Sequence, residues 1–143
     1  GENRPLDGND VQCPFCRIPS LSDQEGLIVY RGTHAYVVMN LYPYNPGHLL
    51  ICAFRHVADL TDLSSDERHE ITDLTSHAMT TIRKVSGADG FNLGMNQGAI
   101  SGAGVAAHIH QHIVPRWSGD ANFMPIIGKT TSSLNPNLNR YED

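Results

Sequence analysis

The sequence predicts an α+β domain, in which a mostly antiparallel sheet of about five strands is accompanied by one long helix and a short helical segment. Several short apolar runs alternate with a period of two, as strands do, and one longer run has helical spacing. The strands and helices do not alternate regularly, as they would in a parallel βαβ sheet. At 143 residues, the chain can build one domain with a substantial core.

Composition indicates how the chain is organised. We expect a loose arm over residues 1–12, a domain over residues 13–128 and a tail over residues 129–143. The net charge of −5 argues against nucleic acid as a partner. No apolar run approaches the roughly 18 residues that span a bilayer, so we expect no membrane partner. The three cysteines do not form an even disulfide framework, which favours a reducing, cytoplasmic location.

The first half of the chain predicts three strands. Residues 26–31 and 33–40 form a hairpin joined at Gly32. Residues 48–54 are apolar enough for a central strand, in which Cys52 is a small buried residue.

A long helix is predicted over residues 65–86. Ser64 and Glu67 fit a capping box at its start, and Gly87 fits a C-terminal cap. One helical face carries the apolar residues Ile71, Leu74, Ala78, Met79, Ile82 and Val85.

A fourth strand over residues 91–96 precedes a glycine-rich loop at residues 97–104. Glycines allow a loop backbone to approach a ligand closely, and its N–H groups could cradle an oxyanion. Such a loop is by itself weak evidence, because most glycine-rich segments are simply turns.

The fifth predicted strand carries three histidines. His108, His110 and His112 alternate with Ile109, Gln111 and Ile113, so a strand places the three imidazoles on one face. Pro115 lacks an N–H group and is predicted to end the strand. This face could bind a metal or supply a nucleophile with helpers, and a surface histidine tract is the simpler alternative.

A second chemical motif is Cys13-Pro14-Phe15-Cys16. A redox motif of the thioredoxin kind would lead into a long helix, whereas Pro19 and a polar stretch follow, so we expect no helix to start here. Structural zinc is favoured, with two further ligands among the eight histidines. The alternative is two free thiols that line a surface turn.

Together these motifs resemble the histidine triad superfamily of nucleotide hydrolases and transferases. Residues 108–114 match its His-x-His-x-His-x-x signature, and Pro46-Gly47-His48 matches its strand start. Asn40 and Asn96 match its polar positions. The resemblance covers residues 13–123 and is greatest to a bacterial, actinobacterial-type branch of diadenosine tetraphosphate phosphorylases and related dinucleoside polyphosphate hydrolases.

The resemblance implies a histidine triad-like fold and a catalytic group of four histidines. His110 is the implied nucleophile and forms a nucleotidyl-histidine, which water or inorganic phosphate then resolves. His112 is implied to contact phosphate oxygens with support from His48, and His108 completes the triad.

It also implies the substrate contacts. Asn96, or Gln97 in its place, would contact phosphate, together with the backbone near Gly104 and Val105. Asn40 would bind ribose hydroxyls, and the base would pack on Ile28 and Leu41.

Relatives that carry a Cys-x-x-Cys motif imply the metal ligands. These are Cys13, Cys16, His56 and His108, a Cys₂His₂ set suited to a closed structural zinc site.

The implied function is cleavage of dinucleoside polyphosphates, such as diadenosine tetraphosphate, by a homodimer, through hydrolysis or phosphorolysis. Nucleoside phosphoramidate hydrolysis and a nucleotide-binding regulatory role are alternatives. A metalloenzyme with all three triad histidines on one zinc is a further alternative, which close spacing along one strand disfavours. Arg116 could contact polyphosphate or pair with Asp120.

Overall fold

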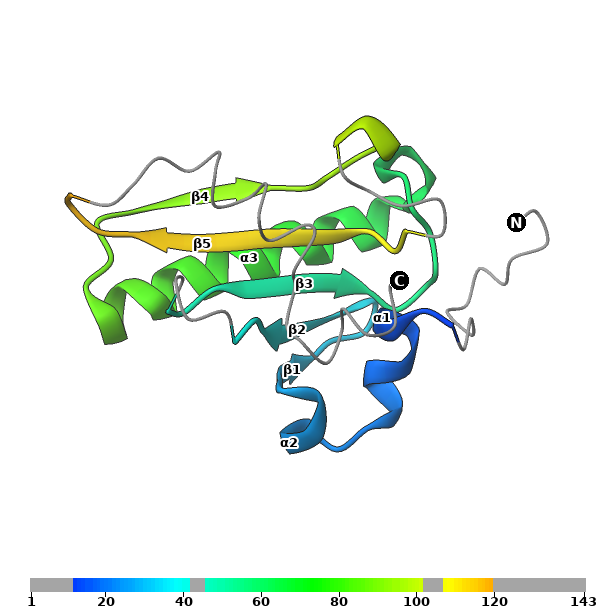
Figure 1. The fold of residues 1–143 in the computed structure, drawn as a ribbon, viewed down its shortest axis with the longest axis horizontal. Coiled ribbons are helices and arrows are strands. Elements are labelled where there is room, and N and C mark those ends of the chain that lie inside the picture. The colour runs from blue at the N-terminus through cyan, green and yellow to red at the C-terminus, as the bar shows by residue number, and fades with distance from the viewer. Residues whose placement is uncertain (1–11, 42–45, 102–106, 120–143) are drawn as a thin grey trace.

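A computed structural model describes residues 12–41, 46–101 and 107–119 of the chain. Five strands form one sheet in the order β1-β2-β3-β5-β4, with every neighbouring pair antiparallel (Figure 1). The strands are β1 Ile28–Arg31, β2 Ala35–Met39, β3 Leu49–Ala53, β4 Gly90–Gly94 and β5 His110–Arg116. The helix α3, Ser65–Ser86, packs along β2, β3 and β5. The α+β fold predicted from the sequence is confirmed.

The N-terminal segment contains more helix than predicted. It folds into α1 Pro14–Arg17, the 3₁₀ turn η1 Ile18–Ser20 and α2 Asp23–Gly26. The expectation that no helix starts at the cysteine motif is therefore wrong, because Pro14 suits a first helical turn, where its missing N–H is not needed. A Ser22–Glu25 capping box begins α2, so β1 starts two residues later than predicted.

The long helix α3 has the predicted boundaries and caps. Ser64 and Glu67 form a complete capping box, and Gly87 closes the helix at φ 66°. Ile71, Ala78 and Ile82 are buried as expected, but Val85 is 77% exposed. The line of buried positions ends at Ile82, one turn before the helix does. Two short 3₁₀ turns, η2 Leu60–Asp62 and η3 Ala99–Ser101, lie in the connections around α3 and β4.

The sheet separates two apolar cores. On the α3 face, Ile109 and Ile113 join the helix residues Ile71, Ala78 and Ile82. On the opposite face, a second cluster contains Cys13, Phe15, Ile18, Ile28, Tyr36, Val38, Leu50 and Cys52. Cys52 is fully buried, as predicted. The N-terminal segment thus covers the sheet face opposite α3.

Strand β5 differs from the prediction at both ends. It begins at His110 and continues through Pro115, which pairs with Phe91 of β4. The carbonyl of Arg116 accepts a hydrogen bond from the Asp89 N–H at 2.8 Å, so the N–H and C=O of Arg116 point towards β4. Those of the preceding residue, Pro115, point towards the β3 side of the strand. The last residue of β5 that pairs with β3 is Ile113, so no β3 acceptor lies opposite Pro115. Pro115 therefore needs no N–H donor.

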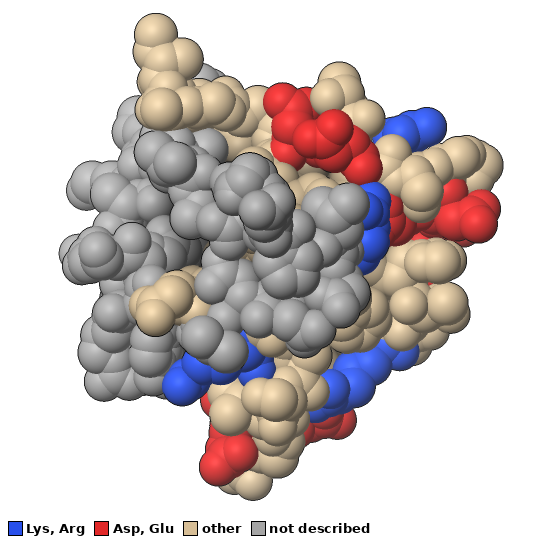
Figure 2. Space-filling view, turned by 90° about the vertical axis from the view of Figure 1, so that its right-hand side faces the viewer, with Lys and Arg blue, Asp and Glu red and all other residues tan. Residues whose placement is uncertain are grey.

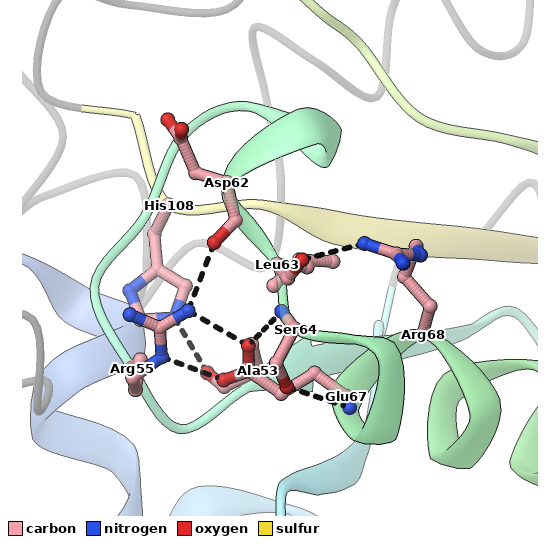
Figure 3. Close-up of polar contacts among 8 residues, drawn as sticks. All are labelled: Ala53, Arg55, Asp62, Leu63, Ser64, Glu67, Arg68 and His108. Carbon is pink, nitrogen blue, oxygen red and sulfur yellow. Dashed lines mark hydrogen bonds and ion pairs between the residues drawn. The ribbon is translucent and has the colours of Figure 1, made fainter.

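An ion pair fastens the start of α3 to the segment that follows β3 (Figure 3). The Arg55 guanidinium donates two hydrogen bonds of 2.8 Å to the Glu67 carboxylate, and a third to the Asp62 carbonyl. Glu67 also accepts from the Ser64 N–H at 2.7 Å. The hydrogen bonds from Arg55, more than any other contact, lower the pKa of Glu67 to about 2.

This ion pair predicts an acid-sensitive contribution to stability. Because the folded pKa lies below the unfolded value of about 4.3, the contribution is complete above that value and is lost as the pH falls towards 2. Glu67→Gln should lower the free energy of unfolding at pH 7 by about 1–2 kcal/mol. Urea unfolding at pH 7, 5 and 3 measures the difference from wild type, which should shrink at pH 3.

Asp73→Asn, on the exposed side of α3, is the control and should leave the unfolding free energy nearly unchanged. A Glu67→Gln difference that is as large at pH 3 as at pH 7 would contradict the role of the charge.

Candidate active site

Two of the triad histidines lie on β5, on the sheet face opposite α3. In the register of β3 and β5, His110 lies opposite Cys52 and His112 lies opposite Leu50. Both partners belong to the second core. His112 is fully buried, and His110 is half-buried. The predicted strand alternation is therefore present for His110 and His112, whereas His108 lies before the first residue of β5.

The hydrogen bond of His110 leaves one ring nitrogen available for chemistry. Its Nδ1–H donates to the backbone carbonyl of His108 at 2.8 Å, because a carbonyl oxygen can only accept. The neutral ring therefore has a lone pair on Nε2. Burial, more than any other factor, lowers the pKa of His110 to about 4, so the imidazole is uncharged at neutral pH. An uncharged imidazole with a free nitrogen can act as a nucleophile.

His112 belongs to a buried chain of side chains. Asn40 Nδ2 lies 3.4 Å from His48 Nδ1, and His48 Nε2 lies 3.1 Å from His112 Nδ1. The Asn40 amide nitrogen can only donate, so His48 accepts on Nδ1 and donates from Nε2. His112 accepts in turn, which places its own proton on Nε2.

Burial also keeps this chain uncharged. Desolvation, with a smaller effect from the neighbouring His110, lowers the pKa of His48 to about 4. Desolvation lowers the pKa of His112 well below its usual value. His112 therefore presents a neutral N–H donor.

Three buried polar atoms in the described part of the chain lack a hydrogen-bond partner. They are Asn40 Oδ1, Asn96 Nδ2 and His112 Nε2. An unsatisfied buried group destabilises a protein by about 1–3 kcal/mol, so each such atom calls for a partner, such as a ligand or a water molecule. All three belong to residues predicted to bind substrate or assist catalysis. One acceptor and two donors suit a sugar hydroxyl and an oxyanion.

The amide of Gln97 is already engaged. Its Oε1 accepts from the Leu60 N–H at 2.6 Å, and its Nε2 donates to the Ala58 carbonyl at 3.0 Å. Gln97 thus ties the base of the glycine-rich loop to the segment before α3. Of the two candidates for a phosphate contact, the geometry favours Asn96.

The other residues predicted to contact substrate differ in burial and position. Ile28 is buried in the second core, whereas Leu41 is 55% exposed beside Asn40. Gly104 and Val105 lie outside the described residues, as does Asp120. Arg116 donates to Asn92 Oδ1 at 2.6 Å, near the end of β5 that lies away from His110. On the face in Figure 2, the described Lys and Arg side chains are interspersed with Asp and Glu.

Sequence reasoning missed Phe15. Its ring stacks on His110, with centroids 4.6 Å apart and an interplanar angle of 29°. Phe15 is separated from His110 by most of the chain, and no local pattern pairs them. The one available signal is its position inside the cysteine motif, whose two cysteines are expected to share a zinc site with His108.

The four predicted metal ligands come together. One ligand atom from each of Cys13, Cys16, His56 and His108 lies within 4.8 Å of the others. Cys13 Sγ is 3.4 Å and Cys16 Sγ is 3.5 Å from His108 Nδ1, and Cys16 Sγ is 3.2 Å from His56 Nδ1. This cluster could hold a metal ion.

The surroundings of the cluster fit a cation. His108 Nε2 donates to the Ala53 carbonyl at 2.6 Å, so its Nδ1 turns a lone pair towards the two sulfurs (Figure 3 shows the ring beside Ala53). The Cys16 hydrogen bond and burial raise the pKa of Cys13, so without a cation the thiol stays protonated. A bound cation would instead favour two thiolates. All three cysteines are free of disulfides.

These observations predict which ring nitrogens carry protons. At pH 7, ¹⁵N–¹H spectra of the histidine rings should place the proton on Nδ1 of His110 and on Nε2 of His48 and His112. Asn40→Ala removes the donor that fixes His48, so His112 should become a mixture of both neutral tautomers.

Asn92→Ala, in β4, is the matched control and should leave the three tautomers unchanged. Wild-type protein with the His112 proton on Nδ1 would contradict the assigned chain of donors.

Comparisons with known proteins agree with this arrangement. The HIT domain family model matches residues 22–119. The AP-4-A phosphorylase of Mycobacterium tuberculosis is 52% identical over 115 residues, which are 80% of this chain and 59% of that protein. The asymmetrical bis(5'-nucleosyl)-tetraphosphatase of Schizosaccharomyces pombe is 33% identical over 93 residues, 65% of this chain and 50% of that protein. The chain thus spans little more than half the length of these relatives.

Solved structures share the fold. A zinc-bound histidine triad family protein from Mycobacterium smegmatis superposes with a TM-score of 0.68 at 24% identity, over 92% of this chain and 96% of that one. A hypothetical histidine triad nucleotide-binding protein from Sulfolobus tokodaii gives a TM-score of 0.65 at 26% identity, over 90% of this chain and 95% of that one. Within the described residues, no helix is both long enough and apolar enough to cross a membrane.

Proposed function

This chain belongs to the HIT domain family, and on that premise we propose that it cleaves dinucleoside polyphosphates through a nucleotidyl intermediate on His110. The observation that carries the proposal is the free, uncharged Nε2 of His110, whose ring lies 5.1 Å from that of His112, a residue with an unpartnered donor. Asn96 has a second unpartnered donor. The similarity to an AP-4-A phosphorylase supports diadenosine tetraphosphate as the substrate.

In the first step, His110 Nε2 attacks the α-phosphorus. A nitrogen–phosphorus bond forms, the bond to the bridging oxygen breaks, and its electron pair leaves with the polyphosphate. The ring becomes positively charged as it reacts, and the hydrogen bond from Nδ1–H to the His108 carbonyl stabilises that charge.

Neutral donors would hold the phosphoryl group. His112 Nε2–H and Asn96 Nδ2 would donate to its non-bridging oxygens. Asn40 Oδ1 would accept from a ribose hydroxyl, and Leu41 with Ile28 would contact the base. Donors that are already oriented and desolvated gain strength as negative charge develops on the phosphoryl oxygens.

In the second step, the acceptor decides the product. Water attacking the nucleotidyl-histidine releases AMP, whereas inorganic phosphate releases ADP; the first step has released ATP in either case. We propose phosphorolysis, because the AP-4-A phosphorylase is half identical over most of this chain.

Turnover of diadenosine tetraphosphate with and without phosphate tests the proposal. Wild-type protein should form ATP together with ADP in phosphate, and a covalent adenylyl group should be trapped on His110. His110→Asn should lower kcat by at least about 10⁴-fold, because no other ring nitrogen occupies that position.

His77→Asn, exposed on α3, is the control and should keep full turnover. Turnover that survives in His110→Asn would exclude the nucleophile. Binding without turnover by wild-type protein would favour the nucleotide-binding role, and cleavage only of P–N substrates would favour phosphoramidate hydrolysis.

We further propose that the Cys13–Cys16–His56–His108 cluster holds structural zinc. The support is its donor set, since two thiols and two imidazoles in a buried, closed arrangement suit tetrahedral Zn²⁺. Zinc would neutralise the two thiolates and join the N-terminal turn to His108, two residues before β5.

Metal analysis tests the zinc site. The Cys13→Ser, Cys16→Ser double variant should lose roughly one zinc ion per chain and unfold at a lower temperature, because binding to the folded site stabilises it. Cys52→Ala removes the third, buried thiol and should keep the zinc. Equal zinc content in the double variant and wild type would contradict the site.

A homodimer and a domain boundary near residue 128 also remain proposals. Among the described strands, β1 and β4 are the edges of the sheet. On β1, Val29 is 51% exposed and Tyr30 is 54% exposed, and on β4 Leu93 is 41% exposed. Open edges with apolar side chains favour pairing with a second chain.

A further inference from the structure

Phe15 packs against the face of the imidazole that is proposed to attack phosphorus. Phe15 is 2% exposed. Its ring stacks on that of His110, with an interplanar angle of 29° and a centroid distance of 4.6 Å. The ring of His112 also contacts that of His110, with centroids 5.1 Å apart and an interplanar angle of 66°. His110 is therefore in contact with two further rings, and Phe15 is the one that lies nearly parallel to it.

The backbone around Phe15 is held in place by buried groups. The Tyr36 hydroxyl donates to the Phe15 carbonyl, and Tyr36 itself is fully buried. Cys13 and Cys16, on either side of Phe15, face His56 and His108 through their sulfurs. The ring of Phe15 thus belongs to a fixed part of the molecule.

A hydrogen bond alone does not fix the plane of an imidazole. The bond from His110 Nδ1 to the His108 carbonyl locates one nitrogen, but the ring can still tilt about that contact. A flat ring stacked on one face restricts this tilt, and offset stacking is the favoured geometry for aromatic pairs. An apolar ring also offers no hydrogen bond that would compete for Nε2.

We propose that Phe15 is a positioning residue that holds the His110 imidazole in its reactive orientation. Its action is through His110, without a role as donor, acceptor or nucleophile. The proposal rests on the proposed function only for its effect on turnover, since the orientation of the ring exists with or without substrate. Misplacing a nucleophile by a fraction of an ångström can slow a reaction many-fold.

Two variants and one control test this role. Phe15→Leu keeps an apolar side chain and removes the aromatic face. Tyr36→Phe keeps the core volume and removes the hydroxyl that donates to the Phe15 carbonyl. Phe54→Leu is the control, because Phe54 packs on Tyr36 in the same core, with centroids 5.2 Å apart, and lies outside the contacts of His110.

The first readout is structural. In wild-type protein, ring current from Phe15 should move the carbon-bound protons of the His110 imidazole upfield, with His110→Asn used to assign them. Phe15→Leu should abolish this shift, Tyr36→Phe should reduce it, and Phe54→Leu should preserve it. Wild-type protein without the upfield shift would overturn the proposal even if no variant folds.

The second readout is the division between kcat and KM for diadenosine tetraphosphate. Phe15→Leu should lower kcat roughly tenfold with KM within about twofold, because the orientation of the nucleophile changes more than the binding groups do. Tyr36→Phe should fall between wild type and Phe15→Leu. Phe54→Leu should match wild type.

The two hypotheses fail in different ways. If wild-type protein does not turn over dinucleoside polyphosphates, the proposed function fails, while the ring-current measurement still decides the role of Phe15. If wild-type protein is active and Phe15→Leu folds with wild-type kcat, the positioning role is wrong and the function stands.

Discussion

The site depends on the hydrogen bonding of one buried residue, His108. Its Nε2–H donates to the Ala53 carbonyl, and its Nδ1 faces the two sulfurs of the cysteine motif. Its backbone carbonyl accepts a hydrogen bond from His110 Nδ1–H. The residue therefore links the end of β3, the N-terminal turn and the nucleophile. The Arg55–Glu67 ion pair supports this arrangement, since it holds the segment that carries His56 against the start of α3.

Desolvation then determines the charge of the site. His48, His110 and His112 have lowered pKa values because the sheet, the N-terminal segment and one another exclude water. Phosphate recognition would thus rely on oriented neutral dipoles, which need no counter-charge when substrate is absent. The unpartnered buried atoms of Asn40, Asn96 and His112 lower the stability of the protein without substrate. Active sites commonly keep such destabilising groups because activity requires them.

Local patterns in the sequence predicted much of this structure. Alternation placed His110 and His112 opposite the α3 face, and capping residues located both ends of α3. Features that depend on a neighbouring strand were not predictable, such as Pro115 inside β5, which is tolerated because Ile113 is the last residue of β5 paired with β3. The same holds for the stacking of Phe15 on His110 and for the choice between Asn96 and Gln97, which depends on contacts with residues nearly 40 positions away.

The partners of the three triad imidazoles also decide between two readings of the histidine strand. If all three bound one ion, their lone pairs would have to converge. Instead His108 Nδ1 faces the sulfurs, while Nδ1 of His110 is held by the backbone and Nδ1 of His112 by His48. His108 lies before the first residue of β5, so its ring can turn towards the N-terminal segment, away from the other two. The position of His108 before the strand thus separates the histidine of the Cys/His cluster from the two histidines on β5.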